Sequence, residues 1–170
     1  MEKYIFEVLA KYNKNANMKM NSIIEKLSEE EWNKKFDGYY KSINELCSHN
    51  FWTGPNWLNL FKNMGHKKSL ENDLLDKKFT KKFDSIGEYL TLMPQIDDII
   101  IDFVNELTED DLKSVLKFTA DDGTNYALNF RITLLHIFIH ATHCRAMISL
   151  YLEMLGKEND YNEIDIDIFA

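Results

Sequence analysis

The sequence predicts an all-α protein, a four-helix bundle with a small β-hairpin before the last helix. Four long segments place apolar residues at steps of three and four, which is the spacing of one helix face. Between the third and fourth segments the pattern changes, and Asp122-Gly123 is a favoured pair for a hairpin turn. Hydrophobic residues make up 45% of the chain and charged residues 28%, so enough apolar surface is present for a core. Amphipathic helices bury their apolar faces against one another, and four of them make a bundle.

The first predicted helix covers residues 4–27, in which most apolar residues recur along one face. Ser28 and Glu31 follow at the spacing of a capping box, in which each side chain bonds to the backbone of the other residue. A short helix is therefore expected over residues 29–35, with Trp32 directed toward the core.

The second and third predicted helices each begin at a serine that can cap them and each contain a proline. They cover residues 42–61 and 85–107. Pro55 and Pro94 lie inside these segments. Because proline lacks a backbone N–H and clashes with the preceding turn, each predicts a kink or a local break.

Several charged features are expected at the surface. Residues 62–84 are predicted to form a long connection with about one helical turn, and they include His66. Adjacent acidic residues occur mostly at caps and turns. The pair Asp97-Asp98 lies inside the third predicted helix, and it is also expected to face solvent.

The last predicted helix covers residues 131–155 and ends at Gly156, which suits a C-cap. The two strands of the hairpin are expected between residues 112 and 130. After the helix, residues 158–170 alternate acidic and apolar side chains, which is compatible with an edge strand, a docked arm or a flexible end.

The composition bounds the class of protein. A chain of 170 residues is typical of one domain, so residues 1–170 are expected to form a single domain. The net charge of -8 argues against binding to nucleic acid or to an anionic membrane. The sequence shows neither a signal-peptide pattern nor an apolar run near the roughly 20 residues of a membrane span. Cys47 and Cys144 are too few for a disulfide scaffold, and a cytoplasmic location is expected.

The main candidate site is a cluster of histidines in the last predicted helix. His136, His140 and His143 lie within one narrow stripe of that helix, with Cys144 at its edge. Residues four apart stack one turn above another, which suits two ligands of one metal ion. A further ligand must come from another helix, and His49 is the only other histidine within an apolar helical pattern. A lone histidine is more often an ordinary hydrogen-bonded residue, but three on one stripe favour a metal site.

Two stretches of the sequence carry a family resemblance. Residues 136–148 read HIFIHATHCRAMI and are followed by Leu155-Gly156, whereas residues 40–49 read YKSINELCSH and are followed by Trp57. In order and spacing they resemble the last-helix and second-helix signatures of the DinB/YfiT-like superfamily, the damage-inducible four-helix bundles. The resemblance spans almost the whole chain, including the hairpin, and it implies the same bundle fold.

In that superfamily a metal is typically held by one histidine of the second helix and by two residues four apart on the last helix, the second directly before an arginine. The resemblance therefore implies the metal ligands His49, His140 and Cys144, with Arg145 as the arginine. The sequence departs from the pattern at two points. The last ligand is usually histidine, and the Gly-Gln that usually follows the arginine is Ala146-Met147 here. A cysteine thiolate favours zinc over harder cations, and nickel or another divalent cation is the alternative.

Other assignments stay open at this point. His143 in place of Cys144 is the second choice of ligand, His136 is the third, and loss of the metal is a further alternative. The residues expected to line a substrate pocket are Trp52, Trp57 and Arg145. The arginine can bind a substrate carboxylate or brace an acidic neighbour, and core packing is the other role for the tryptophans.

The resemblance implies a divalent-metal-dependent enzyme that acts on small molecules in a stress response or in detoxification. Relatives include transferases and isomerases that use low-molecular-weight thiols, together with members assigned as metal-dependent hydrolases, so both thiol transfer and hydrolysis are open. The aromatic content of 13% also favours a homodimer, because aromatic residues are enriched in interface cores. The alternative is a non-catalytic dimeric bundle that has lost or altered its metal site.

Overall fold

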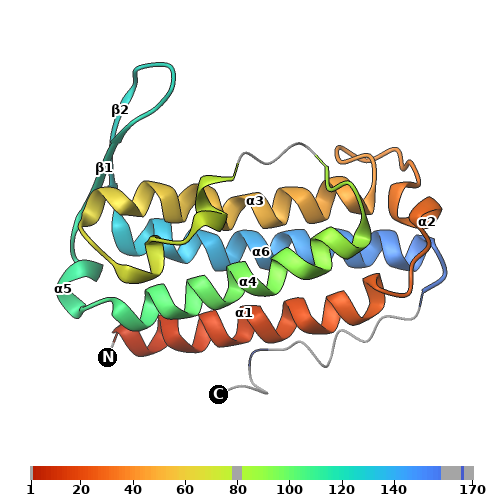
Figure 1. Ribbon diagram of the computed structural model, residues 1–170, viewed down its shortest axis with the longest axis horizontal. Helices are drawn as coiled ribbons and strands as arrows, with labels where there is room; N and C mark the ends of the chain where they lie inside the picture. The colour runs from red at the N-terminus through yellow and green to blue at the C-terminus, as the bar shows by residue number, and fades with distance from the viewer. Residues whose placement is uncertain (1, 78–81, 158–165, 167–170) are drawn as a thin grey trace.

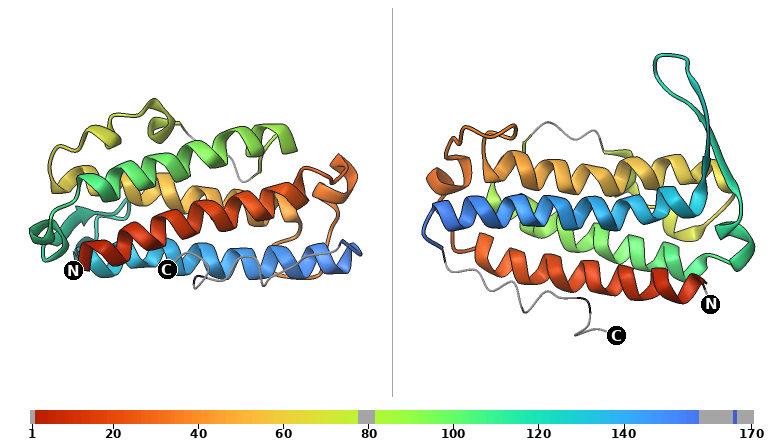
Figure 2. Two further views of the ribbon diagram at one scale, coloured as in Figure 1. Left: turned by 90° about the horizontal axis from the view of Figure 1, so that it is seen from below. Right: turned by 180° about the vertical axis from the view of Figure 1, so that it is seen from behind.

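A bundle of four long helices forms the body of the protein (Figure 1, Figure 2). The computed structural model describes residues 2–77, 82–157 and 166. The long helices are α1 (Glu2–Ile24), α3 (Ile43–Phe61), α4 (Ile86–Glu106) and α6 (Phe130–Met154). The shorter elements are α2 (Glu29–Asn33), the 3₁₀ turns η1 (Lys62–Met64), η2 (Lys68–Leu70) and η3 (Asp73–Asp76), α5 (Glu109–Leu112), and the strands β1 (Val115–Thr119) and β2 (Asn125–Asn129). The predicted fold class, a helical bundle with a hairpin before the last helix, is confirmed.

The order of the helices in space differs from their order in the chain. Figure 1 shows α3 and α4 running in the same direction, while α1 and α6 run the opposite way. The connection after α3 leads back along the bundle and carries η1, η2 and η3, where the sequence predicted about one helical turn. The most extensive packing joins α3 to α6 and α1 to α4. As a result, the histidine-bearing second and last long helices lie against each other although they are distant in sequence.

Side-chain caps fix where several helices begin. The side chain of Ser28 accepts a hydrogen bond from the backbone of Glu31, and the Glu31 side chain accepts one from the backbone of Ser28, so the predicted capping box is confirmed. Ser42 and Ser85 cap α3 and α4 in the same way. Trp32, carried by α2, is fully buried as expected.

The two prolines do not break their helices. Both α3 and α4 continue without interruption through Pro55 and Pro94. A proline inside a helix removes one hydrogen bond and costs about 3 kcal/mol. Each helix also buries many apolar side chains, and burying one large apolar side chain stabilises by roughly 1.5–3 kcal/mol. A local break is therefore wrong, because tertiary packing outweighs the local penalty, and the alternative of a kink at each proline stays a prediction.

The hairpin forms where the change of pattern predicted it. Strands β1 and β2 pair antiparallel, with Leu116 opposite Leu128 and Phe118 opposite Tyr126. Gly123 has a φ of 83°, a left-handed conformation that glycine adopts without strain. Its backbone N–H donates to the carbonyl of Ala120 at 2.9 Å and closes the turn.

The end of α6 also matches the prediction, because Gly156 follows the helix with a φ of 72°. The alternatives considered for residues 158–170 fall, apart from Ile166, outside the residues that the structure describes. Within the described ranges, none of the helices combines the length and the apolar character that crossing a bilayer requires.

Candidate metal centre

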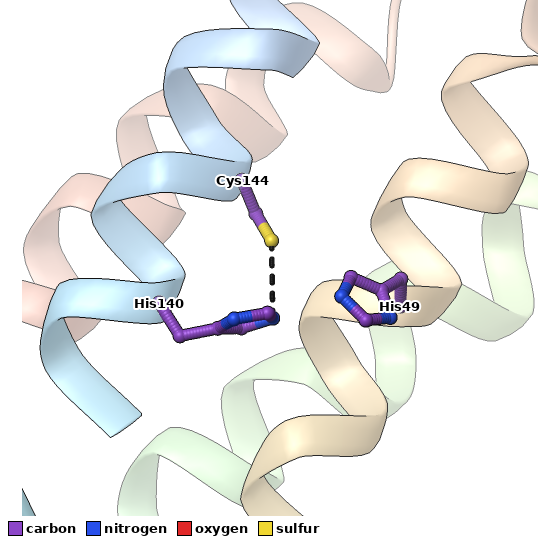
Figure 3. A group of neighbouring side chains, drawn as sticks. All are labelled: His49, His140 and Cys144. Carbon is purple, nitrogen blue, oxygen red and sulfur yellow. Dashed lines mark hydrogen bonds between the residues drawn. The ribbon is translucent and has the colours of Figure 1, made fainter. Parts of the chain in front are cut away.

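Two facing helices bring together the three residues of the candidate site. Cys144 and His140 lie one turn apart on α6, and His49 lies on α3. Their side chains converge in the space between the two helices (Figure 3). His49 and His140 are half-buried, whereas Cys144 is fully buried. The packing of α3 against α6 thus creates a cluster that neither helix could form alone.

The distances within the cluster suit a metal ion. One ligand atom from each of His49, His140 and Cys144 lies within 4.8 Å of the other two. Cys144 Sγ lies 3.3 Å from His140 Nε2, and the rings of His49 and His140 have centroids 4.7 Å apart. Bonds of about 2.0–2.3 Å in a tetrahedral zinc site place ligand atoms roughly 3.3–3.8 Å from one another. A modest inward movement of the side chains would meet that geometry, so the donor set fits a metal of this kind.

Burial sets the protonation states of the candidate ligands. Burial first, and then the neighbouring histidines with His49 foremost, lower the pKa of His140 to about 4. Burial also lowers the pKa of His49, with a smaller effect from His143. Both imidazoles are therefore neutral at pH 7 and offer a lone pair. Burial raises the pKa of Cys144 to about 12, against an opposing effect of Arg145, so a metal must displace the thiol proton.

The two other histidines of α6 lie at the rim of this cluster. His136 is exposed, and its ring centroid is 5.4 Å from that of His140. His143 is also exposed and does not belong to the converging group. In the described part of the chain, the residue that joins His49 and His140 is therefore Cys144 and not His143. His66 is exposed in the connection after α3, beside Glu71, as its sequence context suggested.

The two tryptophans proposed for a substrate pocket lie on α3 beyond His49. Trp57 is half-buried, and its ring packs edge to face on the exposed His136 with centroids 5.6 Å apart. It also packs on Phe61, whose ring is fully buried. Trp57 therefore joins the core to the rim of the cluster. Trp52 is half-buried on the same helix.

Arg145 is buried in a polar network that joins three of the long helices. Its exposed fraction is 2%, and its guanidinium donates to Asn13 Oδ1 at 2.7 Å, Asn17 Oδ1 at 3.0 Å and Thr142 Oγ1 at 3.1 Å. The two asparagine amides in turn donate to the carboxylate of Asp97 on α4, at 2.9 to 3.1 Å. Of the two roles considered for Arg145, this arrangement favours bracing an acidic neighbour over contact with a substrate.

The sequence pattern did not reveal this network. The expectation that Asp97-Asp98 faces solvent is wrong for Asp97, which is 2% exposed, and right for Asp98, which pairs with Lys14 at the surface. A signal was available in α1, where asparagines interrupt the apolar face of the helix at positions 13 and 17. Buried amides require hydrogen-bond partners, so such a pair predicts polar groups on a facing helix.

A helical bundle with a histidine, histidine and cysteine cluster between α3 and α6 defines a class of candidate metalloproteins. A comparison with protein-family models then matches the DinB family over residues 1–163. The chain therefore belongs to the DinB family, as the resemblance of its two helix signatures implied. A search of curated proteins finds no significant match.

Proposed function

We propose that the protein is a divalent-metal-dependent enzyme that acts on small molecules, with zinc held by His49, His140 and Cys144. The observation that carries the proposal is the convergence of these three ligand atoms within 4.8 Å, from two helices that are distant in sequence. Membership of the DinB family supports the same location for the site.

The donor set indicates which metal and which chemistry the site would support. Two neutral imidazoles and one thiolate are typical of zinc, and the soft sulfur disfavours magnesium and calcium. When bound, zinc with three protein ligands supplies a Lewis-acidic centre with an open coordination position. Thiol transfer and hydrolysis both use such a position.

The surrounding residues fit a site for small molecules. The half-buried Trp57 and the exposed His136 form an aromatic rim beside His140. Arg145, directly after Cys144, anchors α6 through the asparagines of α1. That anchor holds the backbone of the cysteine in place, because the guanidinium has partners on another helix.

The second candidate is a non-catalytic bundle with a lost or altered metal site. The raised pKa of Cys144 favours it, because a thiol that ionises near pH 12 binds metal only by giving up its proton. Membership of the family does not distinguish the two candidates.

Metal content tests whether the site holds an ion. The wild-type protein, purified from cells grown with added zinc, is expected to carry about one ion per chain by elemental analysis. The double variant His49→Ala/His140→Ala should lose the ion, whereas His66→Ala, a histidine of the exposed connection, should retain it. A metal-free wild type would overturn the proposal.

The third ligand is identified with cobalt(II) as a substitute for zinc. A thiolate bound to cobalt gives strong charge-transfer absorption in the near ultraviolet, which imidazole does not. Cys144→Ser should abolish this absorption, whereas His143→Ala should leave it intact. The reverse pattern would assign the third position to His143.

A further inference from the structure

The segment between α2 and α3 is held firmly against α6. The ring of Phe36 stacks on that of Tyr151 with centroids 4.1 Å apart. The hydroxyl of Tyr151 donates a hydrogen bond to the backbone carbonyl of Tyr40 at 2.7 Å. A side chain at Gly38 would place its Cβ 1.9 Å from the Tyr151 hydroxyl oxygen, so glycine is required for this close approach. These contacts fix the backbone of Tyr40.

The fixed backbone places the Tyr40 side chain beside the candidate metal centre. Its ring lies against the imidazole of His49, with centroids 4.8 Å apart and an angle of 32° between the planes. Burial raises the pKa of Tyr40, and the nearby Cys144 raises it further. A tyrosine hydroxyl carries its proton at neutral pH and can donate a hydrogen bond, and here its ring lies directly against the candidate ligand His49.

The side chain of Tyr40 is half-buried, and among the residues that the structure describes none accepts a hydrogen bond from its hydroxyl. Most half-buried polar groups are satisfied by the protein, by water or by a ligand. The neighbouring Tyr39 differs sharply, since it is 90% exposed and only touches the edge of the Tyr40 ring.

We propose that the hydroxyl of Tyr40 donates a hydrogen bond to the molecule in the open coordination position of the metal, a role that rests on the proposed function above. The favoured occupant is an anion with a free lone pair on its metal-bound atom, as in a thiolate or a hydroxide, or on an atom close to it, as in a carboxylate. Hydrogen bonds to ionised acceptors are stronger than those to neutral ones, so Tyr40 selects for the anionic form.

The test uses azide as a small anionic probe of the cobalt(II)-loaded protein. Titration followed by visible absorption gives the Kd of azide for the wild type, for Tyr40→Phe and for the control Tyr39→Phe. Tyr40→Phe should bind cobalt with unchanged affinity and unfold at the wild-type temperature, while its azide Kd rises about tenfold. Tyr39→Phe should match the wild type in all three measurements.

Each other outcome overturns a distinct statement. An azide Kd unchanged by Tyr40→Phe overturns the role of Tyr40 and leaves the proposed function standing. A loss of cobalt affinity in Tyr40→Phe also overturns it, because Tyr40 would then support the ligands rather than the bound anion. Failure of the wild type to bind cobalt overturns the proposed function, and the role of Tyr40 with it.

Discussion

A single buried carboxyl group, Asp97, joins α4 to the arginine that follows the candidate cysteine ligand. Two asparagine side chains of α1 lie between Asp97 and Arg145, each accepting from the guanidinium and donating to the carboxylate. Burial raises the pKa of Asp97 to about 7, although the hydrogen bond from Asn17 and the charge of Arg145 act in the opposite direction. The residue therefore titrates near neutral pH rather than near its usual value of 3.8.

The stability contributed by Asp97 should depend on pH in a defined direction. A carboxyl group whose pKa is higher in the folded state binds its proton more tightly there, so its contribution is fully present below about pH 4 and is lost as pH rises through about 7. The free energy of unfolding of the wild type, relative to Asp97→Asn, should therefore fall on the order of 2 kcal/mol between pH 5 and pH 8. Urea unfolding at both pH values measures the difference.

Asp98→Asn is the matched control for this experiment, because Asp98 is exposed and adjacent. The difference in free energy of unfolding between Asp98→Asn and the wild type should change little between pH 5 and pH 8. A stability difference between the wild type and Asp97→Asn that stays constant from pH 5 to pH 8 would show that the hydrogen bonds and the charge of Arg145, rather than burial, dominate the pKa.

At the scale of elements, Gly54 marks a close approach of α3 to α4. A Cβ at this position would lie 2.7 Å from Ile96 Cγ2, a contact that real side chains do not make. Gly54→Ala should therefore lower the free energy of unfolding by about 1–3 kcal/mol, because the two helices must separate to admit the methyl group. Thermal or urea unfolding measures the change.

Gly87 offers the matched control within α4. It is exposed, and a Cβ there would meet only Ser85 Oγ at 3.8 Å. Gly87→Ala should stabilise the protein by up to about 1 kcal/mol, as expected for replacing an exposed helical glycine. Equal changes in the free energy of unfolding for the two substitutions would show that the distance between α3 and α4 does not restrict the side chain at position 54.

The elements show which sequence signals are decisive. Helix caps and tight turns act through hydrogen bonds and dihedral angles within a few residues. The sequence could therefore predict the caps at Ser28, Ser42 and Ser85 and the turn at Gly123. The penalties of Pro55 and Pro94 are equally local, but the buried faces of α3 and α4 outweigh them. The spacing of apolar residues identifies the buried face of a helix, but it does not identify the element that packs against that face.

The candidate site likewise contains residues that the sequence predicts and residues that it does not. The one-turn spacing of His140 and Cys144 and the helical setting of His49 could be recognised in the sequence, because two ligands share a helix and family order supplies the third. Tyr40 and Asp97 could not be recognised. Their positions depend on how a loop docks on α6 and how α1 faces α4, which are contacts between residues distant in sequence.

At the scale of the whole molecule, the candidate metal centre lies between α3 and α6, two helices that are far apart in the sequence. His49 belongs to α3, and the other two ligands belong to α6 across the most extensive helix interface. A metal held at this place would link residues almost 100 positions apart (49 and 144). The folded chain assembles these ligands and the unfolded chain does not, so metal binding should stabilise the fold as a whole.

The stabilisation can be stated as a shift in unfolding temperature. Binding to the folded state alone adds about 4 kcal/mol when the free metal is at 1,000 times its Kd. For a chain of 170 residues, that amount corresponds to an increase in Tm of roughly 10 °C. Calorimetry of the wild type with excess zinc and with a chelator measures the shift, and His49→Ala/His140→Ala should unfold at one temperature under both conditions. A zinc ion that the unfolded chain binds equally well would not raise the Tm. An unchanged wild-type Tm despite bound zinc would therefore show that the packing of α3 against α6 does not assemble the ligands.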